Sequence, residues 1–134
     1  MKLQPYVHFE GRCDEAIEFY KTAIGAKVTM LMRFNQCSEP MSNMNPAMGE
    51  KVMHANLMIG DSELLVSDGH CRGEANFAGF ELTLNVATEA EAEKLFGALA
   101  EGGKVMMPLA KTFFSPKFGM LTDRFGIAWM VIVQ

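Results

Sequence analysis

Six side chains on one face of an expected β-hairpin are the strongest candidates for chemistry in this sequence. The hairpin joins residues 52–59 to residues 63–67 through a turn at Gly60-Asp61, where glycine can adopt the positive φ of a tight turn. That turn pairs Met58 with Glu63, and side chains along a strand alternate between its two faces. One face is then almost purely apolar and suits a covering helix. The other is mixed and suits a cavity wall: His54, Asn56, Met58, Glu63, Leu65 and Ser67.

His54 is the only imidazole on this mixed face, and imidazole is the side chain best suited to proton transfer near neutral pH. We expect His54 to act as the acid–base group, with Glu81 or Glu63 as the carboxylate. Glu81 is central to a second alternating segment, residues 80–86, and Thr83 shares its face. Glu63 lies beside the hairpin turn, so a solvated surface carboxylate is the alternative there.

Structural roles compete with the chemical ones at two of these residues. His54 could be a satisfied histidine that is bonded to a neighbour such as Ser67, and we give this the same weight as a chemical role. Glu81 could form a salt bridge to an arginine such as Arg33 or Arg124. The sequence leaves these alternatives open.

An internal repeat predicts the elements that hold these side chains. Gly25-Ala26-Lys27-Val28 and Gly102-Gly103-Lys104-Val105 lie 77 positions apart, and each ends an amphipathic stretch and begins a strand. The order βαβββ therefore occurs twice, which predicts an α+β fold with two modules. Helices would cover one side of a curved mixed sheet, and the other side would surround a shared cavity. Aligning the repeats puts His8 opposite Asn85 on the cavity side, although the pattern of its own strand does not fix its face.

Local signals set the boundaries of the elements. Apolar residues at helical spacing predict a helix over residues 14–24, and Gly25 suits its left-handed end. Thr88 and Glu91 form a capping box at the start of a second helix that stops at Gly102-Gly103. We expect one domain over residues 1–134, with modules at about 1–70 and 78–134. Strands are expected over residues 3–10, 27–34, 52–59, 63–67, 80–86, 104–112, 118–122 and 127–133.

Composition limits the classes of partner. The 134 residues are 49% hydrophobic and 21% charged, with a net charge of −4, as in ordinary globular proteins. The 12 Lys and Arg residues are scattered, which disfavours nucleic acid, and no apolar run reaches the ~20 residues of a membrane helix. Three unpaired cysteines (Cys13, Cys37 and Cys71) and a start without a signal region favour reduced thiols in a cytoplasmic protein.

Four blocks that together span nearly the whole chain carry a resemblance to a known family. They are residues 5–20, His54-Ala55-Asn56 with Ser67-Asp68, residues 111–114, and residues 118–130. The blocks resemble the PhnB-like branch of the vicinal oxygen chelate superfamily, the 3-demethylubiquinone-9 3-methyltransferase-like domains. The superfamily includes glyoxalase I, extradiol dioxygenases and fosfomycin-resistance proteins. The resemblance implies a glyoxalase-like fold; Phe114 stands where the family usually has Trp, and no Gly-rich loop supports a methyl-donor site.

The resemblance also implies four positions for a divalent metal, and these are poorly filled. They fall at Pro5, near Glu63, at or near Glu81, and at Met130. Proline has no ligand atom, and a hard cation does not favour a thioether. The same alignment would place His8 on the helix side of its strand. We therefore expect no superfamily metal and no other cofactor, with a divalent metal as the alternative.

Our main hypothesis is that the cavity binds a small organic molecule without metal chemistry. The alternative is a metal-dependent or acid–base enzyme, of lyase, isomerase or dioxygenase type, acting on a small oxygen-rich substrate through His54, Glu81 and Glu63. Proteins of this fold commonly pair, so we expect a homodimer. The ligand-binding candidates are Asn56, Met58, Leu65, Ser67, Thr83, Phe113, Phe114 and Met130.

Overall fold

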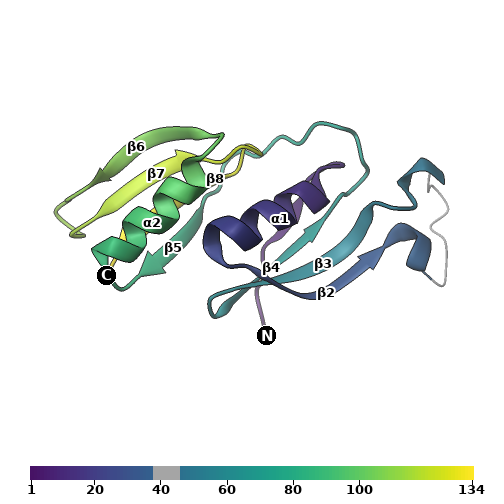
Figure 1. Ribbon diagram of the computed structural model, residues 1–134, viewed down its shortest axis with the longest axis horizontal. Helices are drawn as coiled ribbons and strands as arrows, with labels where there is room; N and C mark the ends of the chain where they lie inside the picture. The colour runs from purple at the N-terminus through teal and green to yellow at the C-terminus, as the bar shows by residue number, and fades with distance from the viewer. Residues whose placement is uncertain (38–45) are drawn as a thin grey trace. The chain divides into compact units, whose positions relative to one another are not determined.

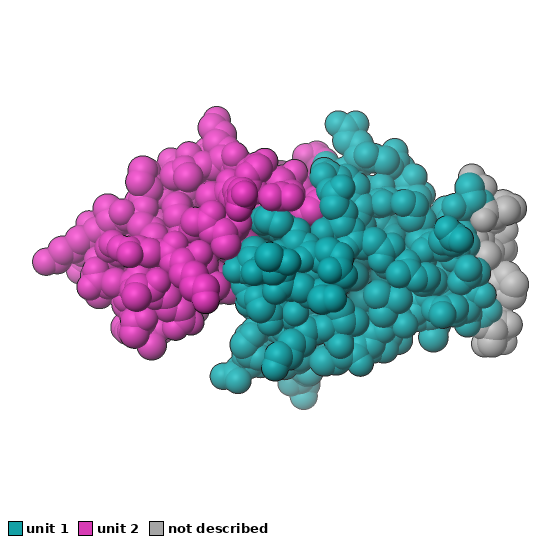
Figure 2. Space-filling model, in the orientation of Figure 1, with its two compact units in different colours: residues 1–75 teal, residues 76–134 magenta. Residues whose placement is uncertain are grey.

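A computed structural model describes residues 1–37 and 46–134 of the chain. The chain divides into two compact units, residues 1–75 and residues 76–134, which Figure 2 colours separately. Each unit contains one βαβββ module, so the α+β fold with two such modules is confirmed. The shared cavity between the modules stays a prediction.

Unit 1 is a four-stranded sheet with one helix against it (Figure 1). The strands lie in the order β1-β4-β3-β2; β1 runs parallel to β4, and the other neighbours are antiparallel. Two short 3-10 helices follow β2, η1 (Phe34–Gln36) and η2 (Pro46–Met48). The main elements are β1 (Tyr6–His8), α1 (Cys13–Ile24), β2 (Lys27–Arg33), β3 (Val52–Ile59) and β4 (Ser62–Ser67).

Unit 2 repeats this topology with the order β5-β8-β7-β6, where β5 runs parallel to β8. Strand β5 begins only at Leu82, and Glu81 is exposed just before it. The expectation that Glu81 is central to a strand is therefore wrong, because the segment before Leu82 does not join the sheet. The elements are β5 (Leu82–Val86), α2 (Glu89–Ala100), β6 (Lys104–Ala110), β7 (Phe118–Thr122) and β8 (Ala128–Val133).

One face of each sheet packs on its helix to form a core. In unit 1, alternate residues of the inner strands are buried on the α1 side, among them Ala55, Leu57, Leu64 and Val66. In unit 2, Trp129 is only 2% exposed and belongs to the core. The other face of each sheet carries the side chains that alternate with these buried residues.

The predicted boundaries at Gly25 and Thr88 are seen in the structure, whereas α2 ends at Ala100, before the expected stop at Gly102-Gly103. Gly25 ends α1 in the left-handed conformation, with φ of 67°. The Thr88 hydroxyl accepts a hydrogen bond of 3.1 Å from the backbone N–H of Glu91 at the start of α2. Within residues 1–37 and 46–134, no helix has the length and apolar character needed to cross a membrane.

Candidate functional site

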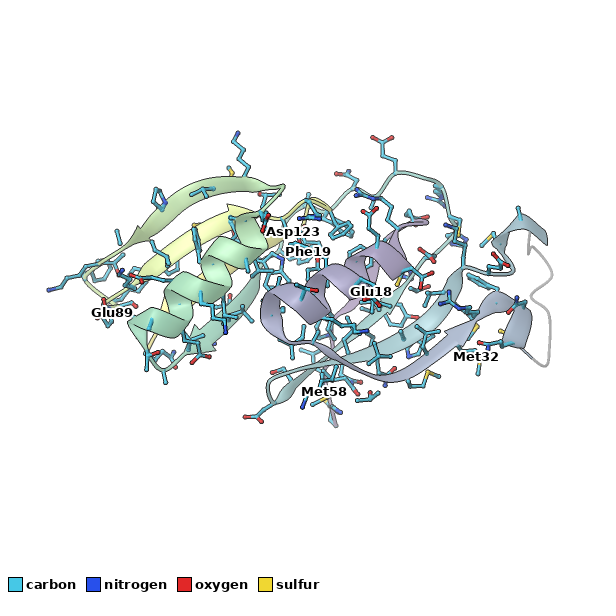
Figure 3. The ribbon with its side chains drawn as sticks, in the orientation of Figure 1. Glu18, Phe19, Met32, Met58, Glu89 and Asp123 are labelled. Carbon is cyan, nitrogen blue, oxygen red and sulfur yellow. The ribbon has the colours of Figure 1, made fainter. Side chains whose placement is uncertain are left out.

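The helix-free face of unit 1 is the face of its sheet opposite α1, and it carries the expected mixed set. The register pairs Met58 with Glu63 and Asn56 with Leu65, as the turn at Gly60-Asp61 predicts. Met58, labelled in Figure 3, lies on the side of the sheet away from α1. Strand β2 adds Met30 opposite Asn56 and Met32 opposite His54, and β1 adds Tyr6 beside Leu65.

A chain of side-chain hydrogen bonds runs across this face. The Tyr6 hydroxyl lies 2.8 Å from Nδ1 of His54, and Nε2 of His54 lies 2.6 Å from Oδ1 of Asn56. Nδ2 of Asn56 donates to Oε2 of Glu63 at 3.2 Å. Oε1 of Glu63 in turn accepts from Gln4 and, at 3.4 Å, from the ammonium of Lys2. Four strand residues therefore form one connected polar path.

The polarity of this path follows from its carboxylate end. An ionised carboxylate only accepts hydrogen bonds, so Glu63 must face the NH₂ group of Asn56. Oδ1 of Asn56 then faces His54, and Nε2 of His54 must carry a proton to bond with it. In neutral His54 the remaining nitrogen, Nδ1, is an acceptor, and the Tyr6 hydroxyl donates to it. Glu63 thus selects the tautomer of an imidazole two hydrogen bonds away.

The two ends of the path have shifted pKa values. Burial is the largest effect on Tyr6 and raises its pKa, although a hydrogen bond with Ser67 acts in the opposite direction. For Glu63, burial acts to raise the pKa, but the hydrogen bond from Asn56 and the contacts with Lys2 and Gln4 outweigh it and lower the pKa. Tyr6 therefore stays a neutral hydroxyl and Glu63 stays an anion near neutral pH.

The helix-free face of unit 2, opposite α2, is mainly apolar. Met107 pairs with Met120, Met120 with Met130, and Met130 with Thr83, so three thioethers and one hydroxyl form a row across the four strands. At the end of this face, the ring of Phe118 meets Phe114 edge to face at 5.1 Å between centroids. Methionine side chains are flexible and polarizable, which suits contact with varied apolar ligands.

The remaining predicted site residues lie beside these two groups or away from them. The hydroxyl of Ser67 is buried and accepts from the backbone N–H of Gly69 at 2.9 Å. Phe113 is fully exposed, whereas Phe114 is half exposed and packs on Phe118. Glu81 is exposed before β5 and lies outside the polar path.

The structural alternatives for His54 and Glu81 take a different form from those expected. His54 bonds to Tyr6 and Asn56, and Ser67 is not its partner. Arg33 binds the carboxylate of Asp14 at 2.9 and 3.0 Å, and Arg124 donates to the backbone carbonyl of Glu101.

Tyr6 is the functional candidate that sequence reasoning missed. Its strand has a polar set (Gln4, Tyr6 and His8) and an apolar set, and the sequence did not fix which set faces the helix. The structure buries Val7 and exposes Tyr6 and His8, so the repeat alignment that put His8 on the cavity side gave the correct face. The same alignment pairs Tyr6 with Thr83, a ligand-binding candidate, and this pairing could have identified Tyr6 as a residue of the same face.

The residues at the four implied metal positions do not fit a hard divalent cation. Pro5 has no donor atom and Met130 offers a thioether. Both oxygens of Glu63 already accept hydrogen bonds within unit 1, and Glu81 lies before its strand. Among residues 1–37 and 46–134, no three His, Cys, Asp or Glu side chains group together as metal ligands would.

Two buried carboxylates accept hydrogen bonds from backbone N–H groups. Asp68 is fully buried and accepts from the N–H groups of Gly11, Cys13 and Val52 at 2.7–3.0 Å. Asp123 accepts at 2.9–3.0 Å from two N–H groups of its own loop and from the indole of Trp129.

The three cysteines are free thiols. Burial, with the nearby Asp68 carboxylate, raises the pKa of the Cys13 thiol far above its ordinary value. The same two causes raise the pKa of Cys71. Because the thiolate is the reactive form, both are poor nucleophiles.

Comparison with known proteins places this geometry in a family. The family model described as 3-demethylubiquinone-9 3-methyltransferase matches residues 1–132. The chain is 34% identical to protein YjdN of Escherichia coli strain K12, over 99% of this chain and 95% of that one. The crystal structure of protein PA1353 from Pseudomonas aeruginosa aligns with a TM-score of 0.86 and 41% identity, covering 100% of this chain and 98% of that one.

More distant structures share the fold. A putative 3-demethylubiquinone-9 3-methyltransferase, PhnB protein, from Bacillus cereus aligns with a TM-score of 0.82 and 26% identity over the whole of both chains. A glyoxalase/bleomycin resistance protein/dioxygenase domain from Frankia aligns with a TM-score of 0.68 at 15% identity, covering 99% and 96%. The chain therefore belongs to the PhnB-like family of 3-demethylubiquinone-9 3-methyltransferase domains and has the glyoxalase fold.

Proposed function

We propose that this protein binds a small organic molecule on the helix-free faces of its sheets, without the divalent metal of its superfamily. The observation that carries the proposal is the polar path from Tyr6 through His54 and Asn56 to Glu63. Ordering polar side chains across a sheet contributes little to packing, so a purely structural role leaves the path unexplained. The methionine row of unit 2 supplies an apolar surface of the kind that lines ligand sites.

Acid–base catalysis on a small oxygen-rich substrate is the second candidate function. It is favoured by one observation, the fixed tautomer of His54, since a general base must present a defined lone pair. The lyase and isomerase classes fit this chemistry better than a dioxygenase, because the residues at the implied metal positions do not suit a hard cation.

Methyl NMR of the twelve methionines tests the binding proposal. A library of aromatic, enolic and carboxylic fragments is added to protein labelled at the methionine methyl groups. We expect binders to shift Met30, Met120 and Met130 on the helix-free faces and to leave Met48, in η2, unchanged. Fragments that shift only Met48, or a tightly bound divalent ion at Glu63 or Glu81, would contradict the proposal.

The proposal includes a homodimer in the cytoplasm. Exposed apolar side chains such as Met106 (57% exposed) and Phe113 (100% exposed) support pairing with a second copy. Light scattering at micromolar concentration should give the mass of a dimer, and a monomer would contradict this part.

A further inference from the structure

We propose that Tyr6 is the residue of unit 1 that contacts the ligand, and that the ligand carries an acidic hydroxyl group, a phenol or an enol, whose proton is passed to His54. This inference rests on the proposed function, because it names the ligand class for the same face. It also changes the role expected for His54, which acts through Tyr6.

His54 has no free nitrogen to offer a ligand. Nδ1 is bonded to the Tyr6 hydroxyl at 2.8 Å and Nε2 to Asn56 at 2.6 Å. A ligand could reach the imidazole only by breaking one of these bonds. The Tyr6 hydroxyl, in contrast, uses its proton toward His54, and the hydrogen bond with Ser67 occupies only one of its two lone pairs, so the other lone pair is left for a ligand. The side chain of Tyr6 is 43% exposed, so the outer end of the path is accessible.

The direction of the hydrogen bonds selects the ligand. While His54 is neutral, Tyr6 donates to Nδ1, so a group that meets Tyr6 must itself donate a hydrogen bond. A hydroxyl satisfies this requirement, whereas a carboxylate that is already ionised does not. The burial that raises the pKa of Tyr6 also disfavours a free tyrosinate, so the two proton movements are coupled.

The proton balance is complete without a co-reactant. The ligand O–H bond breaks as an O–H bond forms on Tyr6, and the original O–H bond of Tyr6 breaks as an N–H bond forms at Nδ1 of His54. The products are a ligand oxyanion, neutral Tyr6 and an imidazolium. Tyr6 then donates to the oxyanion, and Nδ1 of His54 donates to Tyr6. The hydrogen bonds of the path therefore persist with one reversed.

The hydrogen-bonded path links the ring of His54 to one carboxylate. Asn56 accepts from Nε2 and donates to Glu63, so the carboxylate acts on the ring through one amide. Among residues 1–37 and 46–134, the other charged or titratable side chains on this face include His8 on β1, Lys27 on β2 and Lys2 before β1. Lys2 is paired with Glu63, and Lys27 lies opposite Met58, next to the Glu63 position.

The test uses 4-nitrophenol, whose phenolate is yellow and whose neutral form is not. We expect the wild-type protein to bind the dye and raise its phenolate fraction at a pH where most free dye is neutral. Tyr6→Phe should bind the phenolate roughly tenfold or more weakly, because one hydrogen bond to a charged oxygen is lost. His54→Gln should bind the dye in its neutral form. His70→Gln, in an exposed loop of the same unit, is the matched control and should behave as wild type.

Nitrogen NMR of the imidazole gives a readout that a structural role would not move. His54 should carry its proton on Nε2 in the free protein and on both nitrogens in the dye complex. A Tyr6→Phe variant that keeps the full phenolate signal, or a dye that binds wild type only in its neutral form, would overturn the inference. If the dye fails to bind while other fragments shift the face methionines, the inference fails and the proposed function stands. If no fragment shifts them, both fail.

Discussion

The two helix-free faces have the same backbone plan and opposite side-chain chemistry. One row of four residues crosses each sheet at matching positions, as the repeat of 77 residues from Lys27 to Lys104 requires. In unit 1 the row is Met30, Asn56, Leu65 and Tyr6. In unit 2 it is Met107, Met120, Met130 and Thr83.

The repeat extends to an irregularity of the ladder. The register between β2 and β3 shifts between Val28 and Met30, and the register between β6 and β7 shifts between Val105 and Met107. The bulges therefore occupy equivalent positions, although the neighbouring side chains differ. The two units thus share the row of positions and this register shift, but the row of unit 1 contains Tyr6 and Asn56 of the hydrogen-bonded path, whereas the row of unit 2 contains three thioethers. Differences in chemistry between the units must come from side chains and not from the arrangement of strands.

We expect the largest effect from substituting the two buried aspartates, Asp68 in unit 1 and Asp123 in unit 2. Both lie away from the helix-free faces, so they compare the stability of the two units at other positions. Asp68→Asn replaces one carboxylate oxygen, which accepts hydrogen bonds from backbone N–H groups, with an NH₂ group. The NH₂ group then faces another donor, so at least one hydrogen bond is lost. We expect a loss of about 2–4 kcal/mol in the free energy of unfolding, measured with urea. Asp123→Asn should lose less, because its donors lie within six residues and only local structure depends on them.

Asp61→Asn is the control for this pair, since Asp61 is exposed in the hairpin turn. It should stay within about 0.5 kcal/mol of wild type. Equal losses for Asp68→Asn and Asp61→Asn would mean that the buried carboxylate does not hold the N–H groups of Gly11, Cys13 and Val52 together.

The second prediction tests whether equivalent positions of the two units accept the same side chain. Gly103 aligns with Ala26, yet a Cβ at Gly103 would lie 2.2 Å from the backbone oxygen of Thr122. Gly103→Ala should therefore destabilise unit 2 by about 1–3 kcal/mol, measured as a shift of the urea midpoint. Gly97→Ala, with open space around its Cβ on α2, should be neutral or stabilising. If Gly103→Ala were also neutral, unit 2 would have the room at this position that unit 1 has at Ala26.

The sequence predicted the fold well because its signals are local. Hydrophobic alternation located the β3–β4 hairpin and its register, the Gly60-Asp61 turn fixed the pairing, and Thr88 marked the start of α2. Glu81 shows the limit, because alternation continues through Phe80 although pairing with β8 begins only at Leu82. Where a strand joins a sheet depends on its partner, and alternation within one segment does not contain that information.

The candidate site was predicted only in part for the same reason. His54, Asn56 and Glu63 lie on one hairpin, so their common face follows from a single turn. Tyr6 comes from β1, which reaches β4 through a parallel pairing across most of the module. Its three residues are too few to give a reliable period, and its face is decided by the burial of Val7 on the opposite side of the strand. A long-range contact of this kind cannot be derived from the spacing of residues.

The smallest effect comes from the charge that distinguishes the two faces. The register places Ala128 of unit 2 where unit 1 has Glu63, so only unit 1 titrates at this position. The folded pKa of Glu63 is lowered below the ordinary value of about 4.3, because the bonds from Asn56, Lys2 and Gln4 outweigh burial. A lowered pKa gives stability that is present above pH 4.3 and lost as the pH falls through the folded value.

Glu63→Gln should therefore lower the urea midpoint slightly near neutral pH, and the gap to wild type should close in acid. Glu18→Gln, which removes an exposed pair with Lys21 on α1, provides the control for the loss of a surface charge. Glu63→Gln has a second consequence. The neutral amide that replaces the carboxylate can face Asn56 with either its oxygen or its NH₂ group. His54 should then lose its single tautomer in nitrogen NMR while the fold is unchanged. A single Nε2-protonated form in Glu63→Gln would mean that Tyr6, and not the carboxylate, sets the direction of the path.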